Sequence, residues 1–307
     1  MTAITCKDIH FSYKPAFLKR YDVLKGLSFA VAEGSIYGFL GINGAGKTTT
    51  IKLLNNFIKP DTGTVTIFGL DARDIRARSF IGYMPENPGF YAYLNAREFL
   101  TFISRLKGTD RAEIKSSVDD LLRLVGLEGH ADMPVSRYSK GMGQRLGLAQ
   151  ALIGNPALVI LDEPMANLDP IGRRAFRDIF LTLKEQGKTL FFSTHIIPDV
   201  ETLCDKVGIL MNGMIVKEGS LDDLIASHIE YIECILRGRE AAAFAERYRS
   251  QALGVTVQAD NAILRFADEK LADAIVRDLA GSTVRMVSLE AHTQSLEDIF
   301  LHVAGGR

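Results

Sequence analysis

The sequence predicts an α/β protein with a mostly parallel central sheet, followed by a smaller α+β unit. The run Ala157–Leu161 is too uniformly apolar for a strand with one face in water, and Lys188–Ser193 is a further strand of this kind. The run Ile36–Leu40 leads through a glycine-rich loop into a helical pattern, the order of a strand–loop–helix unit. The last 80 or so residues instead alternate short strands and helices, which indicates a second and different domain.

Composition is that of an ordinary globular protein with one large domain or two unequal ones. The chain has 307 residues, of which 47% are hydrophobic, and a formal charge of −1. This balance gives no general attraction to nucleic acid, so we expect no such partner. The isolated residues Cys6, Cys204 and Cys234 predict neither disulfides nor a zinc site and fit a reducing compartment. With no signal-peptide pattern and no apolar run near the about 18 residues of a membrane helix, we expect a cytoplasmic chain.

The segment Gly41–Thr48 matches the phosphate-loop pattern G-x-x-x-x-G-K-[ST] between a strand and a helix. Its glycines let successive backbone N–H groups turn toward phosphate oxygens, where the positive end of the helix also favours negative charge. Lys47 would reach the β- and γ-phosphates, and the Thr48 hydroxyl would hold Mg²⁺. A plain glycine-rich turn is the alternative, which the combined pattern and context disfavour. The predicted nucleotide-binding residues here are Asn43, Gly44, Ala45, Gly46, Lys47, Thr48 and Thr49.

The first forty residues have strand patterns, and Val23–Val31 alternates apolar and polar positions. An aromatic side chain ahead of such a strand can stack on a nucleotide base. Tyr13 is the candidate and Tyr21 is its rival, because the stretch from Lys14 to Arg20 resembles a small insertion that blurs the spacing. An exposed tyrosine without a ligand is the alternative.

Between the phosphate loop and the apolar run at 157–161, short strands give way to helical periodicity. Serine is a good N-terminal cap and opens the last helix of this region. The predicted elements are a helix to about Ile58, strands at Thr64–Phe68 and Ile81–Met84, helices at Ala96–Leu106 and Ala112–Val125, and a helix that opens at Ser139.

Two acids follow the run Ala157–Leu161, at the sheet edge where α/β folds carry their sites. Asp162 is placed to hold Mg²⁺, because phosphoryl transfer needs a metal to neutralise charge on the β- and γ-oxygens. Glu163 would point elsewhere and accept a proton from an attacking water, or orient that water. Two carboxylates that only begin a helix are the alternative. Lys188–Ser193 ends in a similar place, at Thr194-His195.

A hairpin around Asn212-Gly213 closes the first domain, because this dipeptide between two apolar runs is the strongest short hairpin signal. We therefore predict a first domain over residues 1–227 and an accessory or regulatory domain over 228–307. The second domain has the order strand, helix, strand, strand, helix, strand, which indicates a ferredoxin-like unit, and a last helix is expected over Ser295–Val303. It contains no nucleotide motif or acid cluster.

Together, the motifs from about Ile4 to Gly219 resemble the ATP-binding cassette (ABC) transporter ATPases. Several motifs in the family's order are far more specific than any one of them. The resemblance implies a P-loop NTPase fold with a mixed central sheet, an antiparallel β subdomain and a helical subdomain at about residues 87–155. The matching motifs are the phosphate loop Gly41–Thr48, the signature Ser139–Met142, Walker B at Leu158–Glu163, the D-loop Asn167-Leu168-Asp169 and the switch histidine His195.

The resemblance also implies two cassettes arranged head to tail with ATP between them. Ser139 and the backbone of Gly141 would contact the γ-phosphate bound by the other subunit, and Asp169 would act across the interface. Because the chain has one of each motif, we expect a homodimer or a pair with a similar ABC subunit. The implied catalytic residues are Glu163, His195 and Lys47, and the implied metal ligands are Thr48, Asp162 and Glu86.

Two positions depart from the family pattern. The usual L-S-G-G-Q is Tyr138-Ser139-Lys140-Gly141-Met142, which keeps the serine and the second glycine that contact phosphate. Glu86 stands where most members have a glutamine that contacts Mg²⁺ or water and relays to the membrane subunit. A glutamate can still ligate the metal, but it adds negative charge beside Asp162 and Glu163.

Within the family, Pro85-Glu86, Ser139–Met142, Leu168-Asp169-Pro170 and Ser295–Phe300 are similar to the ABC-2 type exporters. That group includes drug, antibiotic, sodium and polysaccharide export ATPases and the ATPase that serves nitrous oxide reductase maturation. We therefore expect a separate ABC-2 type permease that holds the subunit on the inner face of the cell membrane. The apolar stretch Phe90–Leu94 is the expected docking groove, with plain core packing as the alternative.

Other functional classes match the sequence less well. ABC ATPases of DNA repair carry a long coiled coil between the phosphate loop and the signature, and no heptad run lies between Lys47 and Ser139. Translation members usually hold two cassettes in one chain. A kinase-like or GTPase P-loop protein would leave the signature unexplained, and no N-K-x-D motif follows the loop. A non-transport ABC ATPase remains the alternative function.

Overall fold

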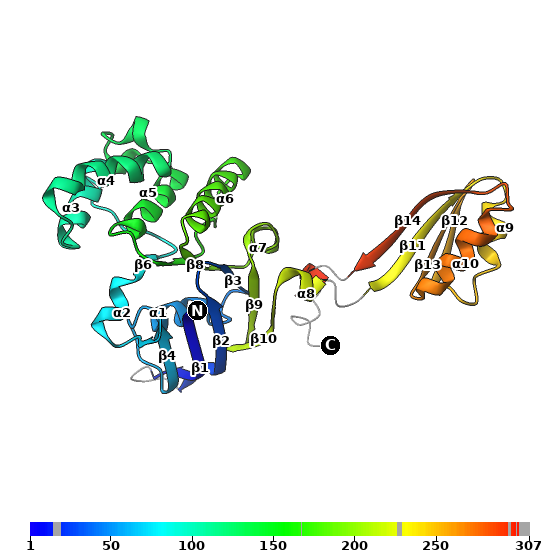
Figure 1. The fold of residues 1–307 in the computed structure, drawn as a ribbon, viewed down its shortest axis with the longest axis horizontal. Helices are drawn as coiled ribbons and strands as arrows, with labels where there is room; N and C mark the ends of the chain where they lie inside the picture. Colours follow the sequence, from blue (N-terminus) through cyan, green and yellow to red (C-terminus); the bar gives the residue numbers. More distant parts are fainter. Residues whose placement is uncertain (15–19, 167, 226–228, 294–295, 299, 301–307) are drawn as a thin grey trace. The chain divides into compact units, whose positions relative to one another are not determined.

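The computed structural model describes residues 1–14, 20–166, 168–225, 229–293, 296–298 and 300 (Figure 1). They form two compact units, Met1–Leu221 and Asp222–Arg307. The boundary between the units falls after Leu221, at the start of the short helix α8 (Leu221–Ile225), whereas the sequence predicts it after residue 227, beyond that helix. Each unit is described by itself below.

The first unit contains two sheets. One is an antiparallel sheet of order β2-β1-β4-β5, and the other is a mixed sheet of order β10-β9-β3-β8-β7-β6 in which only β10 is antiparallel to its neighbour. The mixed central sheet and the antiparallel subdomain are thus confirmed. The strands are β1 (Thr2–Tyr13), β2 (Tyr21–Ala32), β3 (Ile36–Gly41), β4 (Thr62–Ile67), β5 (Leu70–Asp71), β6 (Ile81–Met84), β7 (Leu158–Asp162), β8 (Thr189–Thr194), β9 (Lys206–Met211) and β10 (Met214–Gly219).

The three central strands β3, β7 and β8 are buried along their whole length, which is why their sequences are so uniformly apolar. An aromatic cluster joins the two sheets. Its rings come from Phe29 on β2, Tyr37 and Phe39 on β3, and Phe191 on β8, with neighbouring centroids 5.3 to 5.8 Å apart. Leu158 and Ile160 of β7 belong to the same core, and β7 pairs with β8, so the strands that lead to the candidate site share one core.

Helices connect the strands of the mixed sheet. Helix α1 (Lys47–Leu54) packs against both β4 and β7 and ends earlier than the predicted Ile58, since Asn56 has a φ of 54° that ends the helix. Helix α6 (Pro170–Glu185) contacts β8, and α7 (Ile197–Leu203) contacts β3 and β8. These two α-helices and α2 (Ile75–Ser79) have no counterpart in the sequence prediction.

A group of helices follows β6 and forms the predicted helical subdomain (Figure 1, cyan to green). Helices α3 (Ala96–Leu106), α4 (Arg111–Leu124) and α5 (Lys140–Leu152) pack on one another, with the short helices η1 (Glu128–His130) and η2 (Val135–Arg137) between α4 and α5. Gly147 of α5 lets the segment after β6 come close, because a Cβ there would lie 2.6 Å from the Pro88 Cγ. The end of β6 and the signature helix α5 are therefore tightly packed together.

The second unit is an antiparallel sheet of order β12-β13-β11-β14 with its own core. Numbered within the unit this is the order 2-3-1-4, so the predicted ferredoxin-like βαββαβ arrangement is confirmed. Most of the helix expected over Ser295–Val303 falls outside the described residues. The elements are β11 (Ile229–Arg237), α9 (Ala241–Glu246), β12 (Gly254–Gln258), β13 (Asn261–Phe266), α10 (Glu269–Leu279) and β14 (Arg285–Thr293).

Candidate functional site

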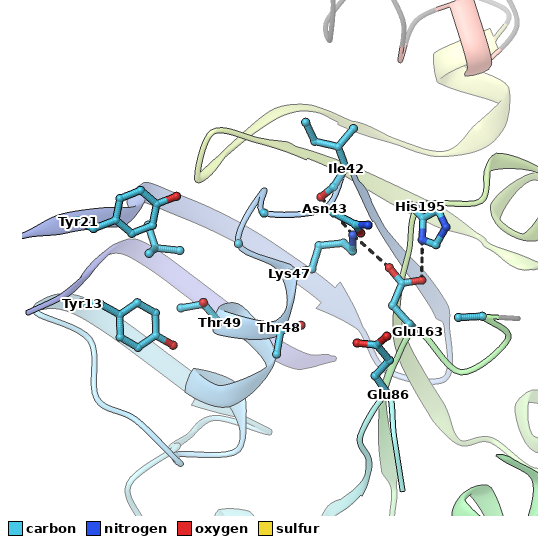
Figure 2. A pocket seen from close by; sticks show the side chains of 14 residues that line it. Tyr13, Tyr21, Ile42, Asn43, Lys47, Thr48, Thr49, Glu86, Glu163 and His195 are labelled. Carbon is cyan, nitrogen blue, oxygen red and sulfur yellow. Dashed lines mark hydrogen bonds and ion pairs between the residues drawn. The ribbon is translucent and has the colours of Figure 1, made fainter. Parts of the chain in front are cut away.

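The phosphate-loop residues connect the carboxyl end of β3 to α1 (Figure 2). Gly44 and Gly46 have φ values of 82° and 112°, in the left-handed region that favours glycine. Gly46 is the N-cap of α1, and a Cβ on it would lie 2.9 Å from the Leu24 Cδ2. The backbone turn and the close packing thus both require glycine here. They leave the first residues of α1, including Lys47 and Thr48, lining a cavity.

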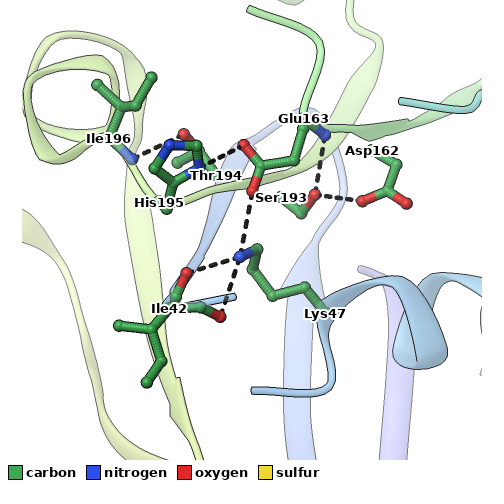
Figure 3. A network of polar contacts seen from close by, with 9 residues as sticks. Ile42, Lys47, Asp162, Glu163, Ser193, Thr194, His195 and Ile196 are labelled. Atoms are coloured by element: carbon green, nitrogen blue, oxygen red, sulfur yellow. Dashed lines mark hydrogen bonds and ion pairs between the residues drawn. The ribbon is translucent and has the colours of Figure 1, made fainter. Parts of the chain in front are cut away.

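Lys47 joins this loop to the end of β7 (Figure 3). Its amino group donates hydrogen bonds to the carbonyl oxygens of Gly41 at 2.6 Å and Ile42 at 3.3 Å. The same nitrogen lies 3.1 Å from the Glu163 Oε1 as an ion pair, and only 6% of the lysine side chain is exposed. The ammonium group is therefore held by two carbonyl oxygens and one carboxylate oxygen.

The two acids at the end of β7 have different partners (Figure 3). The Asp162 Oδ1 accepts a hydrogen bond from the Ser193 hydroxyl at 2.7 Å, and this hydroxyl accepts one from the Glu163 backbone N–H at 2.9 Å. Glu163 has a φ of 46°, so the backbone turns sharply after the strand. Ser193 is a site residue that motif patterns do not find, because its place opposite Asp162 depends on how β7 and β8 pair.

The environment of Asp162 disfavours its charged form. Burial raises the pKa of this carboxyl group above its usual value, and the nearby charge of Glu163 acts in the same direction. Hydrogen bonds from the hydroxyls of Ser193 and Thr48 oppose the rise, as does the charge of Lys47. Asp162 and Thr48 are therefore neighbours that present a carboxylate and a hydroxyl side by side.

His195 follows β8 and contacts the second acid. Its Nδ1 lies 3.0 Å from the Glu163 Oε2, so Glu163 has Lys47 on one carboxylate oxygen and His195 on the other. The glutamate side chain is 9% exposed and the histidine side chain 46%. The carboxylate is thus fixed from two sides while the imidazole keeps an open face.

Tyr13 and Tyr21 lie opposite each other at the open end of the β1–β2 pair and line the same cavity as the phosphate loop (Figure 2). The ring of Tyr13 packs edge-on against Phe11, with centroids 4.9 Å apart, and is 37% exposed, whereas Tyr21 is 61% exposed. The Tyr13 ring is therefore held by packing against Phe11 and is less exposed than the Tyr21 ring, although both rings line the cavity.

One cavity of about 520 Å³ brings most of the predicted site residues together. Ala45 and Asp162 are buried and are not among the residues that line it. The backbone carbonyl of Glu86, which also lines the cavity, accepts a hydrogen bond from the Gln144 amide on α5 at 2.9 Å. The predicted residues in the lining are Tyr13, Tyr21, Asn43, Gly44, Gly46, Lys47, Thr48, Thr49, Glu86, Glu163 and His195.

The remaining predicted residues line a second cavity, of about 450 Å³, between the starts of α5 and α6. Ser139, Gly141 and Asp169 lie here, and none of them lines the first cavity. The Ser139 hydroxyl caps α5 by accepting from the Met142 N–H at 3.3 Å, and Asp169 caps α6 by accepting from the Gly172 N–H at 2.7 Å. Asn167 of the D-loop falls outside the described residues.

The oxygen atoms of Thr48, Asp162 and Glu86 are of the kind that Mg²⁺ prefers. In the described part of the chain, no group of three or more histidine, cysteine or acidic side chains is arranged to hold a metal by itself. Mg²⁺ usually takes one or two carboxylates together with water and substrate phosphates, so a hydroxyl beside one buried carboxylate fits it. None of the described helices is both long and apolar enough to cross a bilayer.

Comparison with known proteins identifies relatives along most of the chain. Residues 24–166 match the family model described as ABC transporter. An uncharacterized ABC transporter ATP-binding protein of Synechocystis sp. is 38% identical over 92% of this chain and 78% of its own length. The bacitracin transport ATP-binding protein of Bacillus licheniformis is 36% identical over 91% of this chain and 92% of its own length.

Solved structures of ATP-binding cassettes superpose on more than two thirds of the chain. The ATP-binding subunit of an ABC transporter superposes with a TM-score of 0.65, at 32% identity, over 72% of this chain and 91% of its own length. A dimeric ATP-binding cassette bound to ADP and phosphate superposes with the same TM-score of 0.65, over 71% of this chain and 98% of its own length, but at 23% identity. That second likeness is evidence for the fold alone.

Proposed function

The chain belongs to the ABC transporter family of ATP-binding proteins, and on this premise we propose that two copies bind ATP between them and hydrolyse it. The observation that supports this proposal most strongly is that the residues of the family motifs line two separate cavities. Lys47 and Glu163 line one, whereas Ser139, Gly141 and Asp169 line the other. A nucleotide that needs both sets therefore needs a second protomer, placed head to tail, to supply the signature serine.

Each residue of the larger cavity has a role in this proposal. Lys47 and the loop amides hold the β- and γ-phosphates, and an aromatic ring, Tyr13, stacks on the base. Glu163 takes a proton from the attacking water as its oxygen bonds to the γ-phosphorus and the bond to ADP breaks. His195 holds the Glu163 carboxylate from one side at 3.0 Å and senses the γ-phosphate with its open face. The backbone amides that would complete the loop contacts are those of Asn43, Gly44, Ala45, Gly46, Thr48 and Thr49.

Magnesium is the metal that suits this chemistry. Thr48 and Asp162 would hold it, with Glu86 as a further oxygen donor in the lining. When bound, Mg²⁺ supplies positive charge to the phosphate oxygens. The residues around it act by keeping the Asp162 carboxylate oriented, which Ser193 does with its hydrogen bond of 2.7 Å.

The transport partner is a separate membrane permease of the ABC-2 type, which would hold the subunit on the inner face of the cell membrane. Support comes from the exposed aromatic residues beyond β6, namely Tyr91 at 47%, Tyr93 at 78% and Phe102 at 38% exposure. The ring of Tyr91 contacts both of the others. The relative named for bacitracin transport supports a transport role, and export is proposed from the motifs that resemble ABC-2 exporters. The relatives described above do not favour the repair or translation alternative.

The test uses Glu163→Gln, which keeps the shape of the side chain and removes its basic charge. We expect ATP turnover to fall by a factor of about 10² to 10⁴, since the general base is lost. With ATP the variant should double in mass in size-exclusion chromatography with light scattering, and with ADP it should stay monomeric. Wild-type turnover in the variant would overturn the role of Glu163, and a strictly monomeric variant at saturating ATP would overturn the paired site.

A further inference from the structure

Asp199 is a fully buried acid that the function proposed above does not use. It lies in the first turn of α7, four residues after His195, and is 1% exposed. Its Oδ2 is buried and has no hydrogen-bond partner among the residues that the structure describes. An acid in such a place needs nearby positive charge, because a buried carboxylate without compensation is strongly unfavourable.

Two arginines of α6 supply that charge. Arg173 and Arg177 are four residues apart and so lie on one face of the helix, and α6 packs on α7. Burial raises the pKa of Asp199, and the charges of both arginines oppose this rise. The Arg177 Nε is itself buried and has no hydrogen-bond partner in the described part of the chain. The carboxylate and the two guanidinium groups therefore interact through their charges between the two helices.

Arg173 also holds the segment that leads into α6. Its Nε donates a hydrogen bond to the Leu168 carbonyl oxygen at 3.3 Å, and its backbone N–H donates to the Asp169 carbonyl oxygen at 2.9 Å. Asp169 in turn caps α6 with its side chain. The position of the 168–169 segment thus depends on where the Arg173 side chain is kept.

The charges of two residues proposed for hydrolysis also act on Asp199. The charges of Glu163 and His195 both act on its carboxyl group, the first raising and the second lowering its pKa. His195 lies four residues before Asp199 and contacts Glu163. Asp199 is therefore near enough to feel the charges of both the His195–Glu163 pair and the two arginines of α6, of which Arg173 holds the 168–169 segment.

We propose that Asp199 is a positioning residue for ATP hydrolysis. Its charge keeps Arg173 in place on the Leu168 carbonyl, so that Asp169, which faces the second protomer, stays in a fixed position relative to His195. This proposal rests on the function proposed above, since it assigns Asp199 to the pairing of the two cavities across the dimer. Asp199 itself touches neither nucleotide nor metal.

The test compares Asp199→Asn with Glu201→Gln, an exposed acid on the same helix. Asparagine keeps the size of the side chain and removes the charge that holds Arg173. We expect kcat to fall about ten- to a hundredfold, as for other small displacements of a catalytic arrangement, while the KM for ATP stays within about twofold. Glu201→Gln should keep wild-type kcat. A wild-type kcat in Asp199→Asn, or an equal loss in Glu201→Gln, would overturn the proposal.

Arg173→Gln tests the same contact from α6 and remains informative if Asp199→Asn folds poorly. Because the two residues act as one unit, the double variant should lose no more kcat than the more affected single variant. Fully additive losses would contradict the proposal. If wild type itself shows no ATP-dependent pairing, the proposed function fails. If it pairs and turns over normally while these variants match it, only the role of Asp199 fails.

Discussion

Asp162 combines an unfavourable position for a charge with a position that the reaction needs. Burial raises the pKa of this carboxyl group from its reference value of 3.8, so the folded protein binds its proton more tightly than the unfolded chain does. The native state then binds more protons than the unfolded state in the pH range just above 3.8, and stability falls as the pH rises through that range. At neutral pH the ionised Asp162 therefore lowers the free energy of unfolding.

Because the ionised Asp162 carboxylate destabilises the folded protein at neutral pH, we expect Asp162→Asn to be more stable than wild type. The amide oxygen can still accept the hydrogen bond from Ser193, but no charge is buried. In the absence of metal and nucleotide we expect the variant to melt about 2–4 °C higher than wild type at pH 7, and this gain to shrink at pH 4. Scanning calorimetry in EDTA checks this, with the exposed Asp178→Asn on α6 as the control. A lower melting temperature at pH 7 would contradict it, and ATP turnover should be lost in either case.

The roles of Tyr13 and Tyr21 in binding the base can be tested one at a time, because the chain contains no tryptophan. A single tryptophan at either position is then the only indole fluorophore. We expect ATP to quench Tyr13→Trp strongly and Tyr21→Trp weakly, since the Tyr13 ring is supported by Phe11 and less exposed. Likewise Tyr13→Ala should weaken ATP binding by about 1–3 kcal/mol, the contribution of one aromatic stack on a base. Stronger quenching at position 21 would reverse the assignment.

At the scale of single elements, the two helices at the second cavity begin with side chains that serve two purposes. Ser139 is the N-cap of α5, and by proposal it also contacts the γ-phosphate of the partner's nucleotide. The structural purpose can be kept while the other is removed, because aspartate caps helices as well as serine and is favoured at their positive ends.

We therefore predict that Ser139→Asp keeps the melting temperature of wild type but loses ATP turnover by more than about tenfold, since its charge repels the γ-phosphate. Combined with Glu163→Gln, it should abolish pairing at saturating ATP. Ser136→Asp, an exposed serine in η2, is the matched control and should behave like wild type. Pairing that survives in the combined variant would show that Ser139 does not face the nucleotide.

The sequence predicts long periodic elements and phosphate-loop geometry well, because both depend on local residues. It predicts the short helix α7 poorly, since seven residues that include Pro198 give little periodicity. Helix α6 was missed although signals for it exist, namely an Asp169 cap, proline at the first helical position and buried apolar residues at helical spacing. The burial of Asp199 near charged groups of α6 depends on how α6 packs on α7, and the hydrogen bonds of Ser193 depend on how β7 pairs with β8. No local sequence pattern contains that information.

At the scale of the whole molecule, the two compact units have separate cores. The core of the second unit comes from its own sheet and helices, with residues such as Cys234, Phe244 and Phe266 each at most 5% exposed. Every residue that lines the two candidate cavities belongs to the first unit. ATP binding and hydrolysis should accordingly be properties of residues 1–221 alone.

The corresponding prediction uses the two halves as separate proteins. Residues 1–221 should bind ATP with a KM within about twofold of the full chain, because no cavity residue is removed. Residues 222–307 should unfold in one cooperative transition, since a four-stranded antiparallel sheet with two helices and its own core can fold independently. Calorimetry of the full chain should then show two unfolding transitions. Adding ATP should raise the melting temperature of only the transition that belongs to residues 1–221. Unfolding of residues 222–307 without cooperativity, or an equal rise of both melting temperatures with ATP, would show that the two units depend on each other for folding. The second unit would then act on the ATPase through shared stability rather than as an independent accessory domain.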